Sequence, residues 1–248
     1  MRLSVLLAPD IAVDMPLAEV TCVVIDVLRA TTSMTAALDA SAKAIYPLPD
    51  AAAAWELQSS LGGEVLLGGE RQGIKINGFD LGNSPREYLP RVVGGRLLAM
   101  TTSNGTAALL AASAGGAAPI YVGSLRNAPA VARRLLREGR PTLLYCAGTR
   151  GMVSLDDVIA AGAIVSACAE APAEVELSDT ARLAQAAYHA VRKDLVGGLR
   201  ASAAGRWLID IGYGADIEYA AEIGTCSVIG QFDGVMIRPA GHVLRRVE

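Results

Sequence analysis

The sequence predicts an α/β protein with a mainly parallel sheet and helices on both faces. Short apolar segments alternate along the chain with alanine-rich segments of helical spacing. The helical segments have the length of crossover connections, which indicates repeated βαβ units. Hydrophobic residues make up 52% of the 248 residues, enough for a sizeable core.

The elements follow in order from the N-terminus. We interpret MRLSVLLAPDIAVD as a first strand, because its apolar part is short and it lacks the cleavage pattern of a signal peptide. Further strands are expected at 21–26, 44–48, 64–68, 96–101, 118–122 and 141–146. Helices are expected at 32–42, 50–61, 103–113, 126–138, 154–169 and 179–193. Beyond residue 193 the pattern is helical and mixed, and it ends in short strands near 226–229 and 233–237.

Two features concern the organisation of the chain. The segment 68–90 is polar, glycine-rich and without period, and long irregular segments inside compact domains are usually functional. TTSMTAAL (31–38) resembles TTSNGTAAL (101–109), for which duplicated α/β units and chance similarity are both open explanations. No linker rich in Pro, Gly or Ser divides the chain. We therefore expect a single domain over 1–248, with an internal two-lobed organisation whose boundary the sequence does not mark.

Composition excludes several classes of function. No stretch of about 18 uncharged apolar residues is present, so we expect no membrane span. The net charge is −3 and no basic stripe carries interleaved aromatics, which argues against nucleic acid as a partner. The four cysteines are far apart with no CxxC pair, which fits a reducing cytoplasm. With only two histidines, a metal site would use mainly oxygen ligands, which favours Mg²⁺.

Three loops could hold an anion, because each follows an expected strand and two of them open a helix. Helix N-termini offer unpaired N–H groups and a partial positive charge. Ordinary capping by Ser or Thr is the alternative for each loop taken singly. Three such loops at one sheet edge favour a binding site. The candidate residues are Thr31, Thr32, Ser33, Thr102, Ser103, Asn104, Gly105, Thr106, Gly148, Thr149 and Arg150.

Charged residues accompany these loops. Arginine holds an oxyanion with two parallel hydrogen bonds, and lysine acts as a point charge. Mg²⁺ prefers one or two carboxylates together with waters and substrate oxygens. Asp26 is the strongest candidate, because it ends an apolar strand and a buried carboxylate needs a partner. The remaining candidates are the cations Arg29, Arg71, Lys75 and Arg150 and the carboxylates Glu70, Asp80, Asp156 and Asp157.

The sequence does not match the motifs of two known classes of phosphate-binding or phosphatase proteins. The segment GGERQGIK differs from the P-loop pattern GxxxxGK[ST] in the position of its lysine. The haloacid-dehalogenase pattern would need a second aspartate two places after Asp26, where Leu28 stands.

Five blocks in order resemble the 2-phosphosulfolactate phosphatase family. They are IDVLRATTS (25–33), GERQGIKINGFDLGNSPREY (69–88), TTSNGT (101–106), VGSLRNAPAVA (122–132) and CAGTRGMVSLDDVIAAGAIV (146–165), with a weaker echo at 205–224. The resemblance implies an α/β fold and Mg²⁺-dependent hydrolysis of 2-phospho-3-sulfolactate to 3-sulfolactate on the route to coenzyme M. Ala107 stands where the family usually has arginine, and the SLED pattern is SLDD here.

The resemblance also suggests roles for the candidates. Asp26, Glu70 and Asp157 are expected to hold Mg²⁺, and Arg29 and Arg71 to stabilise charge on the transferring phosphoryl group. Attack by water and attack by Asp26 itself are both open.

Other functions stay open beside this one. Ala107 favours a non-catalytic protein that binds small polyanions, and an isomerase of phosphorylated acids is a third alternative. Lys75 and Arg150 are expected to bind the distal sulfonate or carboxylate. We expect a cytoplasmic homodimer that acts on a small anionic substrate.

Overall fold

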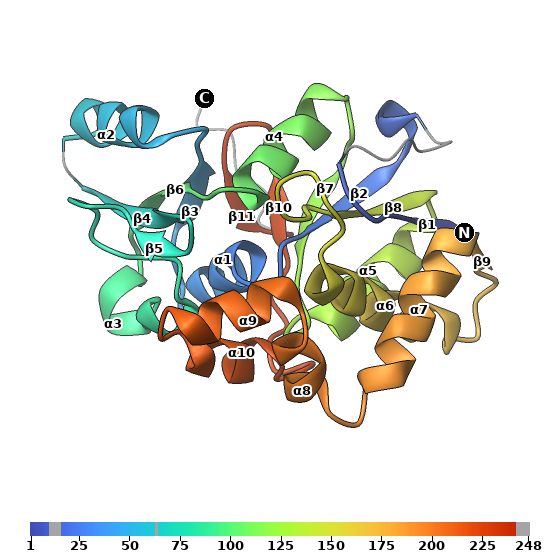
Figure 1. The fold of residues 1–248 in the computed structure, drawn as a ribbon. Helices are drawn as coiled ribbons and strands as arrows, with labels where there is room; N and C mark the ends of the chain where they lie inside the picture. Colours follow the sequence, from blue (N-terminus) through green and yellow to red (C-terminus); the bar gives the residue numbers. More distant parts are fainter. Residues whose placement is uncertain (10–15, 63, 242–248) are drawn as a thin grey trace, which may run out of the picture.

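The computed structural model describes residues 1–9, 16–62 and 64–241 and shows an α/β protein built on one mixed sheet (Figure 1). The sheet order is β5-β4-β6-β3-β11-β10-β7-β2-β8-β1-β9. Its strands are β1 (Arg2–Leu6), β2 (Thr21–Ile25), β3 (Ala44–Pro47), β4 (Val65–Arg71), β5 (Ile74–Lys75), β6 (Leu97–Thr101), β7 (Ile120–Gly123), β8 (Thr142–Cys146), β9 (Glu176–Leu177), β10 (Gly230–Phe232) and β11 (Ile237–Pro239).

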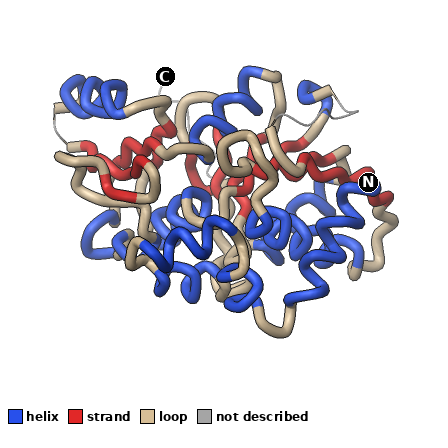
Figure 2. Tube along the Cα trace, in the orientation of Figure 1, coloured by secondary structure: helices blue, strands red, loops and turns tan. Residues whose placement is uncertain are grey.

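The helices follow the strands as the predicted alternation requires (Figure 2). They are α1 (Ala30–Asp39), α2 (Ala51–Ser60), α3 (Pro90–Val93), α4 (Gly105–Ala114), α5 (Ala128–Glu138), α6 (Leu155–Ala169), α7 (Asp179–Val191), α8 (Leu195–Arg200), α9 (Ala203–Asp210) and α10 (Gly214–Ala220). Single 3-10 turns lie at Leu17–Glu19 and Pro85–Glu87. None of the described helices combines the length and apolar character that a bilayer crossing needs.

The predicted fold class is confirmed, and β2 shows why both faces of the sheet are apolar. Cys22 and Val24 pack into a core that includes residues of α1 and α4. Val23 and Ile25 point to the opposite face and pack with residues of α5, α6 and α7. Because successive strand residues face opposite sides, a strand between two helical layers must be apolar at every position.

The expected central strands and helices all form, with ends displaced by a few residues. The final hairpin lies later than expected, at β10 and β11 rather than near 226–229 and 233–237. The segment 68–90 is less irregular than expected, because β4 continues through Arg71 and turns into β5.

The sheet consists of two parallel blocks that run in opposite directions. One block is β4-β6-β3 and the other is β7-β2-β8-β1-β9. The hairpin β10–β11 joins them through three antiparallel pairings. The prediction that all functional strand ends share one sheet edge is therefore wrong, since the sequence pattern did not reveal the inserted hairpin.

Twist nevertheless brings the carboxyl ends of the two blocks together. Five strand-to-strand steps separate β6 from β2. Adjacent strands rotate by roughly 20–25°, so these steps accumulate roughly 100–125°. In a sheet twisted this strongly, two blocks that run in opposite directions can still have their carboxyl ends on the same side of the molecule. The loops that follow β2, β4, β6 and β8 meet at a single pocket.

Candidate active site

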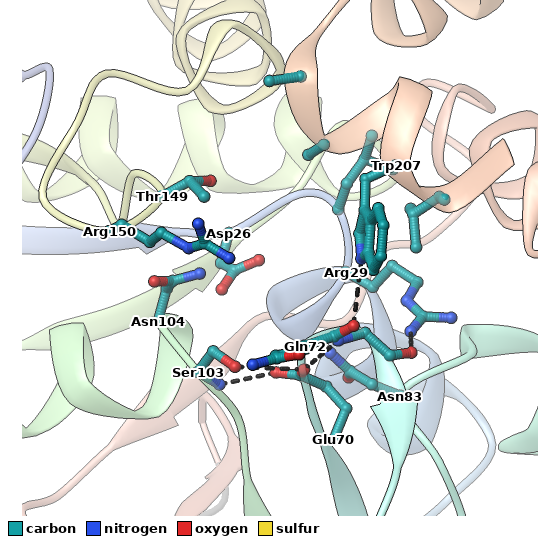
Figure 3. Close-up of a pocket in the computed structure, with 15 residues that line it drawn as sticks. Asp26, Arg29, Glu70, Gln72, Asn83, Ser103, Asn104, Thr149, Arg150 and Trp207 are labelled. Atoms are coloured by element: carbon teal, nitrogen blue, oxygen red, sulfur yellow. Dashed lines mark hydrogen bonds between the residues drawn. The ribbon is translucent and has the colours of Figure 1, made fainter. Parts of the chain in front are cut away.

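A cavity of about 410 Å³ lies where these loops meet the C-terminal helix α9. Its polar wall comes from the strand ends, and Figure 3 shows these side chains around one space. Its apolar wall is largely α9. The lining residues are Asp26, Leu28 and Arg29 after β2, Glu70, Gln72 and Gly73 at β4–β5, Ser103 and Asn104 after β6, Thr149 and Arg150 after β8, Asn83, and Ala203, Ala204, Trp207 and Leu208 of α9.

Asp26 is the buried carboxylate of this pocket, with 7% of its surface exposed. Its backbone N–H donates to the Thr31 hydroxyl at 3.0 Å, and its Oδ1 accepts the N–H of Ala30 at 3.2 Å. The pKa of Asp26 is raised from 3.8 to about 7, mainly by burial and also by repulsion from Glu70 and Asp156, while hydrogen bonds from backbone N–H groups act in the opposite direction. A carboxyl group with this pKa can exchange protons near neutral pH.

Gly105 allows α4 to begin directly against this carboxylate. A Cβ at this position would lie 2.6 Å from the Cβ of Ala30 and 2.8 Å from Oδ2 of Asp26. The first backbone N–H of α4 therefore approaches Asp26, where it favours the ionised form.

Glu70 connects the β4–β5 turn to the loop after β6. Its Oε1 accepts the Ser103 N–H at 2.7 Å, and its Oε2 accepts the Gly73 N–H at 2.6 Å and the Ser103 hydroxyl at 3.2 Å. Only 6% of Glu70 is exposed. These bonds hold the carboxylate at the pocket surface in one orientation.

Arg29 lies at the opposite wall and is already paired. Its Nη1 contacts Oδ2 of Asp216 at 2.7 Å, and the guanidinium stacks on the Tyr213 ring at 4.3 Å from the centroid. Its other terminal nitrogen donates to the Gly73 carbonyl. Both partner side chains of the ion pair are 2% exposed, so the charge of Arg29 is largely compensated inside the protein.

A family model described as 2-phosphosulpholactate phosphatase matches residues 8–234. The chain belongs to this family. Relatives named "Probable 2-phosphosulfolactate phosphatase" include one from Clostridium acetobutylicum, 33% identical over 232 residues (94% of this chain, 97% of the relative). One from Carboxydothermus hydrogenoformans is 38% identical over 221 residues (89% and 86%), and one from Clostridium perfringens is 41% identical over 191 residues (76% of each). The 2-phosphosulfolactate phosphatases are phosphoric monoester hydrolases.

In this family member, the hydroxyl groups expected to bind phosphate after β2 are used inside the protein. Thr31 donates to the Asp26 carbonyl at 2.9 Å, Thr32 to the Val27 carbonyl at 2.7 Å and Ser33 to the Asn83 carbonyl at 2.7 Å. All three lie in the first turns of α1 and none lines the cavity.

In the loop after β6, some of the expected phosphate-binding residues also bond inside the protein, and others line the cavity. Thr102 and Thr106 exchange hydrogen bonds at 3.0 to 3.2 Å and form a capping arrangement. Ser103 and Asn104 line the cavity instead, because the loop between strand and helix turns their side chains outward (Figure 3).

Of the cationic residues expected at the site, some line the cavity and others do not. Arg150 lines the cavity, is exposed, and its side chain is directed toward Asp26 (Figure 3). Arg71 lies outside the lining and donates to the Glu70 carbonyl at 2.8 Å and the Thr101 hydroxyl at 2.9 Å. The Lys75 amine donates to the Asp80 carbonyl at 2.9 Å, also outside the lining.

Asp157 lies behind the pocket. Its oxygens accept the N–H groups of Val27 at 2.8 Å and Gly148 at 3.0 Å, which fixes the loops after β2 and β8 to α6. Burial raises its pKa well above 3.8, and Asp156 and Asp26 raise it further. Of the three expected metal ligands, Asp26 and Glu70 line the cavity and Asp157 does not. Across residues 1–9, 16–62 and 64–241, no group of three or more His, Cys, Asp or Glu side chains is placed to hold a metal ion.

Sequence reasoning missed the contribution of the C-terminal region. Asp216 pairs with Arg29, and Trp207 lines the cavity and donates to the Gln72 carbonyl at 3.1 Å. Both residues lie in the weaker family echo at 205–224, which was the available signal. Asn83 lies in a stronger block, NSPREY, where its amide had no assigned role.

Proposed function

We propose that this protein hydrolyses 2-phospho-3-sulfolactate, or a similar small phosphate ester that carries acidic groups, to the hydroxy acid and phosphate. The observation that carries the proposal is the placement of Asp26. This buried carboxyl group, whose pKa is raised to about 7, lines a cavity together with Glu70 and Arg150 in a chain of the 2-phosphosulfolactate phosphatase family. Perturbed carboxyl groups in clefts are typical of catalytic sites.

Charge balance supports a divalent cation. The cavity is lined by two carboxylates, and of its two arginines Arg29 is neutralised by Asp216. A substrate with phosphate, sulfonate and carboxylate groups would add several negative charges beside a single unpaired cation among the described lining residues, Arg150. Mg²⁺ takes one or two carboxylates, with substrate oxygens and waters completing its shell, so Asp26 and Glu70 form a suitable donor set. When bound, Mg²⁺ would neutralise phosphate oxygens and make phosphorus more electrophilic.

The side chains around Asp26 suit a phosphoryl group. Arg150 and the side chain of Asn104 are directed toward the carboxylate (Figure 3). In the proposed complex Arg150 donates to the non-bridging phosphate oxygens, and the amide of Asn104 adds a neutral donor. Asp26 then either attacks phosphorus, giving an aspartyl phosphate that water hydrolyses, or takes the proton of a water that attacks phosphorus. In both cases the bond from phosphorus to the ester oxygen breaks, and that oxygen takes up a proton and leaves as the hydroxyl group of the hydroxy acid. Trapping of an acyl phosphate on Asp26 by borohydride reduction during turnover would identify attack by the carboxylate.

The test is phosphate release from 2-phospho-3-sulfolactate and from p-nitrophenyl phosphate, with Mg²⁺ and with EDTA. We expect release with Mg²⁺, and a loss of several orders of magnitude in kcat for Asp26→Asn. Near-normal turnover by this variant would contradict the assignment.

A matched pair of arginine variants tests the proposed anion contact. Arg150→Ala is expected to raise KM at least tenfold, whereas Arg133→Ala removes an exposed arginine of α5 and leaves KM unchanged. Equal effects of the two variants would show that Arg150 does not contact substrate.

The same assay addresses the alternative function. Binding of 3-sulfolactate without phosphate release from either ester would favour a polyanion-binding protein. Ala107, the departure that suggests this alternative, is exposed on α4 and lies outside the cavity lining. The homodimer, the cytoplasmic location and the place on a route to coenzyme M stay predictions.

A further inference from the structure

The side-chain amide of Asn83 is an unpaired polar group in the pocket wall. Asn83 lines the cavity and is 5% exposed. Its Oδ1 is buried without a hydrogen-bond partner among the described residues. Buried polar groups in native proteins nearly always have a partner, so such a group calls for an explanation. Since the amide borders the cavity, a bound ligand is the natural partner.

Hydrogen bonds hold the backbone at Asn83 and on both sides of it. The Ser33 hydroxyl donates to the Asn83 carbonyl at 2.7 Å. On one side, the Gly82 carbonyl accepts the hydroxyl of Tyr88 at 2.7 Å. On the other side, the Ser84 hydroxyl donates to Asp216 at 2.7 Å. An unpaired group on a fixed backbone is the arrangement of a preorganised binding contact.

The position of Asn83 indicates which part of a substrate it would meet. In Figure 3, Arg150 and Asn104 gather near Asp26, while Asn83 is drawn away from them, in the region of Glu70 and Gln72. A phosphoryl group held at Asp26 and Arg150 would therefore direct the rest of the ester toward Asn83.

We propose that the side-chain amide of Asn83 binds the acidic group on the non-phosphoryl part of the substrate, a carboxylate or sulfonate, and so selects esters of acids. This inference rests on the proposed function. Arg29 at the same wall is already paired with Asp216, so it does not offer a free positive charge to the ligand. A neutral donor at this position can supply the contact instead. As placed, the unpaired atom is the oxygen, which accepts, whereas an oxyanion needs a donor. Rotation by 180° about the terminal bond of the amide exchanges oxygen and nitrogen and puts the donor at the unpaired position.

The test compares Asn83→Ala and Asn83→Asp with Asn77→Ala, which removes an exposed amide of the same connecting segment. Three substrates separate the contacts: 2-phospho-3-sulfolactate carries both acidic groups, 2-phospholactate carries the carboxylate alone, and p-nitrophenyl phosphate carries neither. For Asn83→Ala we expect kcat/KM on 2-phospho-3-sulfolactate to fall about tenfold, which corresponds to about 1.4 kcal/mol. We expect less than a twofold change on p-nitrophenyl phosphate.

The two acidic substrates identify the group that is bound. A loss on both shows that the carboxylate is the partner, and a loss on 2-phospho-3-sulfolactate alone shows that the sulfonate is. Asn83→Asp places a negative charge beside the same group, so its loss should exceed that of Asn83→Ala. An equal loss on all three substrates, or no loss on any, would overturn the proposal.

Thermal unfolding separates a binding role from a structural one. Removing an unpaired buried group should leave the melting temperature of the ligand-free protein unchanged or raise it. A fall of several degrees for Asn83→Ala would mean that the amide supports the fold, and would overturn the proposal.

Binding of 3-sulfolactate, measured by calorimetry, keeps the inference testable without turnover. If the wild-type protein releases no phosphate from any ester, the proposed function fails by itself. About tenfold weaker binding of 3-sulfolactate by Asn83→Ala would then still support the contact. Equal binding by the two proteins, or no binding by the wild type, would overturn it.

Discussion

Asp26→Asn is expected to stabilise the metal-free protein above neutral pH while it abolishes turnover. Burial is the main reason that the pKa of Asp26 rises from 3.8 to about 7. Each unit of pKa corresponds to about 1.4 kcal/mol. Keeping this carboxylate ionised at pH 8 therefore costs the native state about 4 kcal/mol, and a neutral amide of the same shape removes that cost.

The sign of the pH dependence follows from the raised pKa. The native state binds the Asp26 proton more tightly than the unfolded state does. Below about pH 4 the group is protonated in both states and carries no penalty. As pH rises from about 4 to 7, only the unfolded state releases the proton freely, so stability falls, and the full penalty is present above about pH 7.

Urea unfolding in EDTA at several pH values measures this effect. The stability advantage of Asp26→Asn over the wild type should grow by about 3 kcal/mol between pH 5 and pH 8. Glu56→Gln, which neutralises an exposed carboxylate in α2, should show no such trend. If the site binds Mg²⁺ as proposed, adding Mg²⁺ should reduce this stability difference, because a bound cation would stabilise the ionised wild-type site. A variant no more stable than the wild type at pH 8, or an advantage independent of pH, would refute the reasoning.

Three further outcomes are expected. Asp216→Asn leaves the buried charge of Arg29 without its counterion and should lower the free energy of unfolding, measured in urea, by about 3–5 kcal/mol. The double variant Arg29→Met/Asp216→Leu removes both charges and should lose less stability. Equal losses by the two variants would contradict this reasoning. Gly105→Ala should lower kcat at least tenfold, because the new Cβ would displace the Asp26 carboxylate. Gly214→Ala, whose new Cβ would make only an ordinary contact with Ile209 at 3.8 Å, should retain activity. A fully active Gly105→Ala enzyme would contradict the need for a fixed carboxylate. EDTA should abolish phosphate release and Mg²⁺ should restore it, and undiminished release in EDTA would exclude the proposed cation.

Several residues of the candidate site could be predicted from the sequence, because they stand at or after the ends of apolar strand segments. Asp26, Glu70 and Arg150 each come after an apolar segment, and the structure brings all three to one pocket. Hydroxyl side chains were harder to assign. Thr31 and Ser103 look alike in the sequence, yet the hydroxyl of Thr31 bonds to the backbone of Asp26 whereas Ser103 lines the cavity. That difference depends on the side-chain direction at each helix start, which residue type alone does not encode.

The sequence by itself determined the alternation of strands and helices, because hydrophobic periodicity and turn chemistry act over a few neighbouring residues. Only the tertiary structure decided the strand order, the reversal at the β10–β11 hairpin and the pairing of Arg29 with Asp216, 187 positions away. These features depend on which surfaces bury each other in the whole chain. The sequence does not show which arginine will pair with which aspartate, because the pairing forms only when packing removes both side chains from water.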